Sequence, residues 1–294
     1  MTSKRSILVI LDRPGGPQFA LDRARQLAKA TGAHLHLASF CWLPMVDDDR
    51  VFDTHQRLAL QKGAINERQR WLDGLILDAG LRAADVSTEV VWARDIADWV
   101  NEWTEGKSVE LVAKTVHRGT ASILHTPLDW QLLRTCKVPL LLSVKPINVG
   151  PVLATVDLGH TDETHQLMNH RVLETAQQVA ERLGVPLHGM HVVETTGFPD
   201  SLDGYEVDVL AADAELRSRD LLEALLKPYG MEAANVHLRV GHVGPAVADL
   251  ARELDASLMV VGTGARGRIG SMLVGNSSER ILSEAPCDVL AVHA

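Results

Sequence analysis

The sequence has few cysteines, no excess of positive charge and no long hydrophobic run, and each absence excludes a class of protein. Three cysteines in 294 residues (Cys41, Cys136, Cys287) lie far apart and outside any metal-ligand spacing, which predicts reduced thiols in a cytoplasmic protein. A net charge of -9 argues against nucleic acid or an anionic membrane as a partner. No apolar run approaches the roughly 18–20 residues of a membrane span, and the run after Arg5 is too short for a signal peptide.

Signatures of catalysis are also missing. The sequence contains no Gly-x-Ser-x-Gly elbow, and no Cys–His pair is suggested by its spacing. The usual P-loop is absent, because Gly106-Lys-Ser108 lacks the glycine five residues earlier and precedes a strand rather than following one. We therefore expect no catalytic residue and, more generally, a binding protein rather than an enzyme.

Thirteen histidines invite metal hypotheses, but their spacing supports none. His188 and His191 share a predicted strand, where an odd separation sends them to opposite faces. A further group lies in a loop and a helix start, and we interpret its members as polar loop residues because spacing alone fixes no coordination sphere. This group consists of Asp157, His160, Asp162 and His165. We expect no metal site within the protein.

The chain repeats itself. An apolar run ending in an acid, Ser6 to Asp12, recurs 145 residues later as Val152 to Asp157, and each run is followed by a helical pattern that stops at a glycine, Gly32 or Gly184. Helical patterns and apolar strands then alternate in the same order in both halves. This alternation is typical of a parallel sheet covered on both faces. We predict an α/β protein of two tandem, doubly wound, five-stranded, Rossmann-like domains, residues 1–146 and 151–294.

A glycine-rich loop follows the fourth strand of the second half. Four glycines fall in the nine residues from Gly262 to Gly270, and such a loop lets successive backbone amides converge on an anion. The next helix begins near Gly275, where free amides suit a phosphate. Asp157, at the end of the first strand, is placed to accept a hydrogen bond from an adenine or a ribose. Asn276 followed by Glu279 is alternatively a capping box, which would satisfy those amides internally.

These residues resemble the universal stress protein family. The second half carries Gly262, Ala265 and Gly275-Asn276 at the spacing of that family's Gly-x2-Gly-x9-Gly-(Ser/Thr) motif, with alanine and asparagine as departures, and the tandem layout covers the whole chain. The resemblance implies a regulatory, homodimeric protein of the stress response that binds ATP, with Mg²⁺ for a triphosphate. It places the nucleotide site in the second half. With three loop neighbours included, the expected site residues are Asp157, Val192, Val261, Gly262, Gly264, Ala265, Arg266, Gly275, Asn276, Ser277 and Ser278.

The equivalent loop of the first half lacks the motif glycines of a phosphate-binding loop. Our alignment of the halves puts Lys114 opposite Gly262, His117 opposite Ala265 and Pro127 opposite Gly275, and a proline has no amide hydrogen to offer a phosphate. A lysine at the end of a central strand needs a counter-charge. Either an ion pair with Asp12 or an acidic ligand would supply it.

Two further functions stay open at this stage. The protein is alternatively a slow ATPase or autokinase, with Arg266 or Arg268 stabilising phosphate charge. All six tryptophans lie in the first half, where Trp99 and Trp103 share a helix face. They indicate either core filling or an apolar cavity, and a cavity would suit a carrier of an amphipathic, lipid-like ligand.

Overall fold

A computed structural model describes residues 5–48, 50–117, 127–194, 204–263 and 276–293. The first half runs through ten elements in chain order: β1 (Ser6–Leu11), α1 (Phe19–Thr31), β2 (His34–Cys41), α2 (Pro44–Asp47), α3 (Thr54–Asp78), β3 (Val86–Trp92), α4 (Ile96–Thr104), β4 (Val109–Thr115), α5 (Pro127–Thr135) and β5 (Leu140–Ser143). The predicted alternation of strands and helices is confirmed.

The second half repeats this order without a counterpart of α2. Its elements are β6 (Val152–Thr155), α6 (Glu163–Leu183), β7 (Leu187–Glu194), α7 (Gly204–Leu226), β8 (Val236–Gly241), α8 (Val243–Glu253), β9 (Leu258–Thr263), α9 (Asn276–Glu284) and β10 (Asp288–His293), with short 3-10 turns at Lys227–Tyr229 and Ala233–Asn235. Gly32 and Gly184 end α1 and α6 in the left-handed conformation, with φ of 71° and 67°, as predicted. No described helix combines the length and apolar character that a membrane crossing needs.

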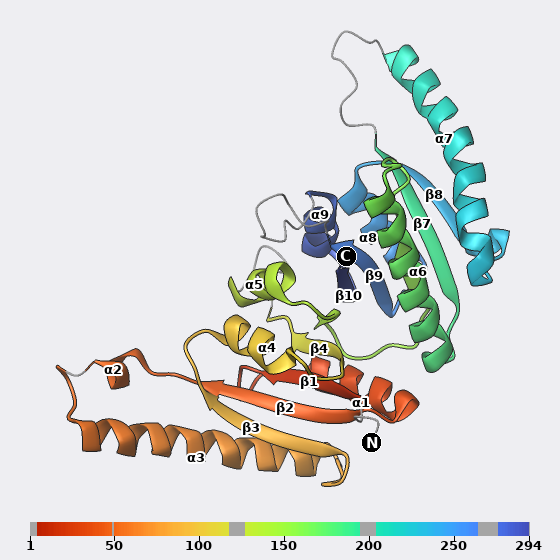
Figure 1. Cartoon of the computed structure of the whole chain (residues 1–294). Helices are drawn as coiled ribbons and strands as arrows, with labels where there is room; N and C mark the ends of the chain where they lie inside the picture. Colours follow the sequence, from red (N-terminus) through yellow and green to blue (C-terminus); the bar gives the residue numbers. More distant parts are fainter. Residues whose placement is uncertain (1–4, 49, 118–126, 195–203, 264–275, 294) are drawn as a thin grey trace.

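The five strands of the first half and the five strands of the second half form one ten-stranded sheet. The strand order is β3-β2-β1-β4-β5-β10-β9-β6-β7-β8, and every neighbouring pair is parallel except β5 and β10, which are antiparallel. Figure 1 shows this junction at the centre of the molecule, with α3 and α7 beside the two outer strands. The closing strands of the two halves thus lie side by side.

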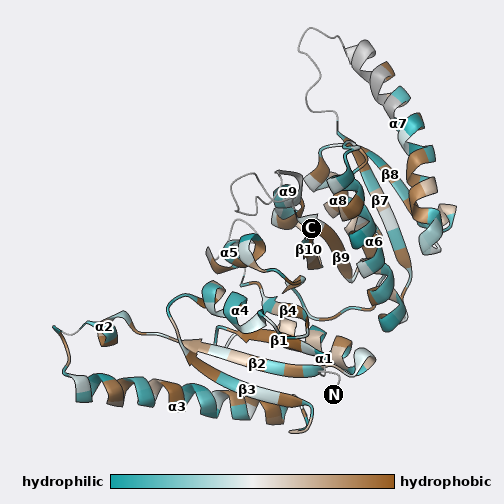
Figure 2. Ribbon diagram, in the orientation of Figure 1, coloured by the Kyte–Doolittle hydropathy of each residue, from teal (hydrophilic) through white to brown (hydrophobic). Residues whose placement is uncertain are grey.

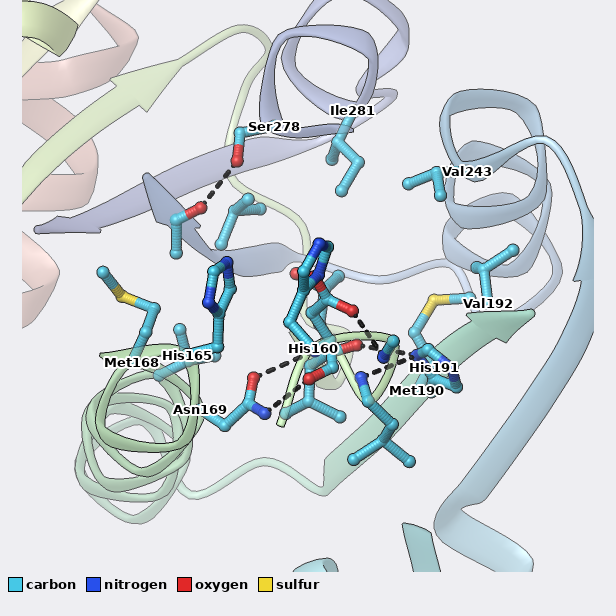
Figure 3. Close-up of a pocket in the computed structure, with 18 of the residues that line it drawn as sticks. His160, His165, Met168, Asn169, Met190, His191, Val192, Val243, Ser278 and Ile281 are labelled. Carbon is cyan, nitrogen blue, oxygen red and sulfur yellow. Dashed lines mark hydrogen bonds and ion pairs between the residues drawn. The ribbon is translucent and has the colours of Figure 1, made fainter. Parts of the chain in front are cut away.

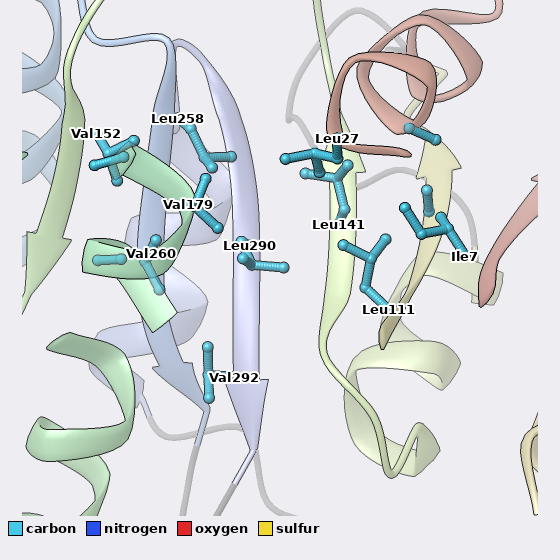
Figure 4. Packing of buried hydrophobic residues seen from close by; sticks show 14 of the residues in the cluster. Ile7, Leu27, Leu111, Leu141, Val152, Val179, Leu258, Val260, Leu290 and Val292 are labelled. Atoms are coloured by element: carbon cyan, nitrogen blue, oxygen red, sulfur yellow. The ribbon is translucent and has the colours of Figure 1, made fainter. Parts of the chain in front are cut away.

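Helices cover both faces of this sheet, as the apolar strands predict. Helices α1, α3, α6 and α7 pack on one face, and α4, α5, α8 and α9 pack on the other. The central strands β1, β9 and β10 are mostly apolar in Figure 2, because their side chains on both faces are buried, whereas the outer strands β3 and β8 carry polar residues and are only partly buried. The first of these cores runs across the junction, where Leu27 and Leu141 of the first half lie near Leu290 of the second (Figure 4).

A buried ion pair also joins the halves. Arg23 Nε of α1 lies 2.9 Å from Asp288 Oδ2 of β10, and both side chains are only 1% exposed. Arg23 donates a second hydrogen bond to the carbonyl of Ser257, and Asp288 Oδ1 accepts one from the backbone amide of Val144. The Asp288 carboxylate of the second half is thus held by groups of the first half. Burial raises the pKa of Asp288, and Arg23 opposes that effect.

Candidate functional site

A cavity of about 720 Å³ opens at the carboxyl ends of the strands of the second half. It lies where β6 has β9 on one side and β7 on the other, the point at which strand order reverses and open parallel sheets bind ligands. Figure 3 shows α6, α8 and α9 converging on it. Its size lies within the range of about 300–1,000 Å³ that is typical of small-molecule sites.

The cavity brings together five of the seven described residues that the sequence assigned to a nucleotide site. Asp157, Val192, Val261, Gly262 and Ser278 all line it. Asn276 and Ser277 form the first two positions of α9. The remaining expected residues, Gly264, Ala265, Arg266 and Gly275, lie outside the described part of the chain, so the phosphate loop stays a prediction.

Asp157 is held in place by a residue that sequence reasoning missed. Asn169 of α6 accepts a hydrogen bond from the Asp157 backbone amide at 2.9 Å and donates one to the Asp157 carbonyl at 2.7 Å. Asp157 Oδ1 also accepts a bond from the amide of Gly159. The carboxylate is therefore oriented by backbone contacts, although its side chain is 48% exposed and open to a ligand. Asn169 stands on a helix twelve residues away, and no local motif marks it.

The walls on either side of Asp157 are mostly apolar. Met190 and Val192 of β7 and Val243 and Ile281 of α8 and α9 are almost fully buried around the cavity. His191, which sequence reasoning also did not place here, directs its Nδ1 to the carbonyl of Val156 at 3.1 Å. Burial lowers the pKa of His191, so its ring is neutral at neutral pH. Apolar walls of this kind suit an aromatic base.

Two glycine-loop neighbours have structural contacts. Ser278 Oγ donates a hydrogen bond to the carbonyl of Gly262 at 2.7 Å, which ties α9 to the end of β9. A Cβ on Gly262 would stand 2.6 Å from Cγ of Met168, so the Met168 side chain of α6 occupies space that only a glycine leaves free. These contacts give two of the predicted site residues a role in packing.

The strand register corrects the predicted equivalence of Lys114 and Gly262. In the first half Ala113 of β4 pairs with Leu141 of β5, and in the second half Val260 of β9 pairs with Leu290 of β10. Leu141 and Leu290 pair with each other across the junction, so Ala113 and Val260 occupy equivalent positions. Lys114 therefore corresponds to Val261, and Thr115 to Gly262. The predicted equivalence was wrong because the alignment used one constant difference in residue number between the two halves. In the structure, equivalent positions of the fourth strands differ by 147 residues (261 minus 114), whereas the starts of α5 and α9 differ by 149 (276 minus 127).

In the first half, Lys114 forms the ion pair expected with Asp12. Its Nζ lies 3.0 Å from Asp12 Oδ2 and 2.9 Å from Asp129 Oδ1, and the side chains of Lys114 and Asp129 are fully buried. Asp12 also contacts His117 Nε2 at 3.0 Å. Burial raises the pKa of Asp12, but the attraction of Lys114 and the hydrogen bonds of Lys114 and His117 outweigh it and lower the pKa.

This network stands where the second half has its cavity. Asp129 is the third residue of α5, as Ser278 is of α9, so Lys114, Asp129 and Asp12 correspond to Val261, Ser278 and Asp157. The first half thus fills its own site with a charge network. No local pattern marks Asp129 for this role, because its partner Lys114 lies on a strand.

Four of the tryptophans pack against the two cores. Trp99 and Trp103 stack with ring centroids 6.0 Å apart, Phe40 meets Trp99 edge-on, and His36 stacks on Trp103. Trp130 is packed against the same core. These contacts support core filling for this part of the chain.

His188 and His191 face opposite sides of β7, as predicted, since His188 Nδ1 contacts His237 on β8.

The comparisons with known proteins agree with the fold and the repeat. The model of the Universal stress protein family matches residues 4–145 and again residues 162–293. The chain belongs to the universal stress protein family. The Universal stress protein E homolog of Haemophilus influenzae is 24% identical over 98% of this chain and 97% of its own length.

Among solved structures, a Pseudomonas aeruginosa chain described as a universal stress protein is 26% identical, with a TM-score of 0.71 over 99% of this chain and 93% of its own. Two other universal stress proteins, matched over 50% and 49% of this chain with TM-scores of 0.30, were crystallised with cAMP and with dAMP.

Proposed function

We propose that this universal stress protein binds an adenine nucleotide, ATP, in its second half and acts as a regulatory binding protein. The observation that carries the proposal is the cavity of about 720 Å³ at the strand-order reversal, with the Asp157 carboxylate at its mouth and apolar walls behind. The base lies between the walls, and Asp157 accepts a hydrogen bond from the base or the ribose. The phosphates extend toward the start of α9, whose amides suit an anion.

A divalent cation would accompany a triphosphate as Mg²⁺ and neutralise part of its charge. The cytoplasmic location and the homodimer expected from the family belong to the same proposal.

No described contact favours the alternatives of catalysis or of an amphipathic ligand. Ser278 donates its hydroxyl hydrogen to Gly262, which leaves that hydroxyl engaged with the backbone rather than poised for phosphoryl transfer. Trp99 and Trp103 contact each other and the core, so they fill the space that a lipid-like ligand would need. We therefore rank simple binding first.

Titration calorimetry of the full chain with ATP tests the proposal. We expect one site per chain, because only the second half keeps the apolar lining, and we expect Asp157→Asn to weaken binding about tenfold or more through the loss of a charge-assisted hydrogen bond.

The matched control is Asp12→Asn, which changes the corresponding residue of the first half and leaves the ATP affinity of the folded protein unchanged. No heat of binding at millimolar ATP, or equal losses in both variants, contradicts the proposal.

A further inference from the structure

Two histidines and an aspartate meet at the mouth of the cavity. Asp157, His160 and His165 each offer one ligand atom, and these atoms all lie within 4.8 Å of one another. The two imidazole rings are stacked, with centroids 4.4 Å apart and planes 15° apart. In Figure 3 both rings project from the loop and from α6 toward the same side of the cavity. Their spacing in sequence had suggested only polar loop residues.

One pair in this group is already close to metal-ligand geometry. His160 Nδ1 and Asp157 Oδ2 are 2.8 Å apart. Two ligands of a tetrahedral zinc ion, each bound at about 2.0–2.1 Å, stand about 3.3 Å apart. An ion can therefore take the place of the shared proton with a small outward shift of two exposed side chains, and that proton leaves to the solvent.

The second histidine is oriented by a carboxylate that is not itself a ligand. His165 Nδ1 contacts Asp162 Oδ2 at 2.6 Å, and Asp162 also caps α6 by accepting a bond from the His165 amide. This contact places the hydrogen on Nδ1 and leaves the lone pair of Nε2 free. A carboxylate behind the imidazole is the arrangement that orients and strengthens metal-bound histidines in proteins.

The ligand chemistry selects the kind of ion. Imidazole nitrogens favour zinc and its transition-metal neighbours, whereas Mg²⁺ and Ca²⁺ favour oxygen ligands alone. Three protein ligands leave a fourth position that faces the cavity and is open to water. We propose that Asp157, His160 and His165 bind one divalent transition-metal ion of the zinc type at the mouth of this cavity. Nucleotide binding is not a premise, because all three ligands come from the chain itself.

Zinc titration of the chelator-treated full chain, without nucleotide, tests this site by calorimetry. We expect one Zn²⁺ per chain. The double variant His160→Ala with His165→Ala removes two ligands and lowers the affinity by more than about 100-fold, whereas Asp162→Asn lowers it about 10–100-fold, as outer-shell changes do. Cobalt supplies a second readout, since Co²⁺ held by nitrogen and oxygen shows visible absorption without a thiolate charge-transfer band.

His170→Ala is the matched control, because His170 is exposed on the same helix and contacts Tyr229 instead of the cluster. It leaves the affinity unchanged. The proposal is overturned if the wild-type chain takes up no Zn²⁺, if the double variant binds as tightly as the wild type, or if His170→Ala weakens binding as much. Because ATP is absent throughout, none of these results bears on the proposed nucleotide site.

Discussion

Replacing Lys114 with valine, the residue at the corresponding position 261, removes a fully buried cation from its network with Asp129 and Asp12. Asp129 then keeps a buried carboxylate without the ammonium 2.9 Å away, and Asp12 loses its contact at 3.0 Å. Breaking a buried ion pair by removing one partner costs about 3–5 kcal/mol, because the remaining charge is left uncompensated. We expect Lys114→Val to lower the free energy of unfolding by that amount.

Adding Asp129→Ser to this variant copies a second residue of the other half, Ser278. The buried carboxylate is then gone together with the ammonium, and apolar or small groups replace buried ion pairs at little cost. The double variant should be more stable than Lys114→Val alone, with a coupling of about 1–3 kcal/mol between the two positions.

Urea unfolding followed by tryptophan fluorescence measures these changes, since all six tryptophans lie in the first half. Val261→Ala is the control: it removes apolar contacts without a charge at the corresponding position, at about 2 kcal/mol. The reasoning fails if Lys114→Val costs less than this control, or if the two substitutions are additive.

Three other predictions follow from buried groups. Burial lowers the pKa of His293 to about 4 from an ordinary 6.5, so between these pH values the unfolded chain binds more protons than the folded chain. The free energy of unfolding therefore falls as the pH falls, by about 3 kcal/mol in all. If His293→Gln shows the same dependence of unfolding free energy on pH as the wild type, this prediction is wrong. Arg23→Met leaves Asp288 buried without its counter-charge and should cost about 3–5 kcal/mol in urea unfolding, and a loss below 1 kcal/mol would argue against it. Burial raises the pKa of Cys136 to about 11 and of Cys287 to about 12, so maleimide labelling should require unfolding; rapid labelling of the native protein would show that the thiols are accessible.

Much of the fold could be predicted because its signals are local. Apolar strands, helical periodicity and glycine stops such as Gly32 depend on residues close in sequence, and all of them reappear in the structure. The register of Lys114 could not be obtained in this way, because it is set by hydrogen bonds to a neighbouring strand. The positioning role of Asn169 likewise depends on how α6 docks against β6.

The candidate site was predictable to the same extent. Asp157 follows β6 and Gly262 lies near the end of β9, so their place at one edge of the sheet follows from topology. The pairing of Lys114 with Asp129 joins a strand to a helix across the first half, and the pattern of either element alone gives no sign of it.

The antiparallel junction of β5 and β10 has a consequence for how the chain is made. β5 is synthesised with the first half, but its partner is the last of the described strands to leave the ribosome. Until then β5 presents an open row of amides and carbonyls, beside apolar side chains such as Leu27 and Leu141. During that interval two nascent chains can pair through this edge. The nascent first half is therefore the stage at which this protein most needs protection from its own copies.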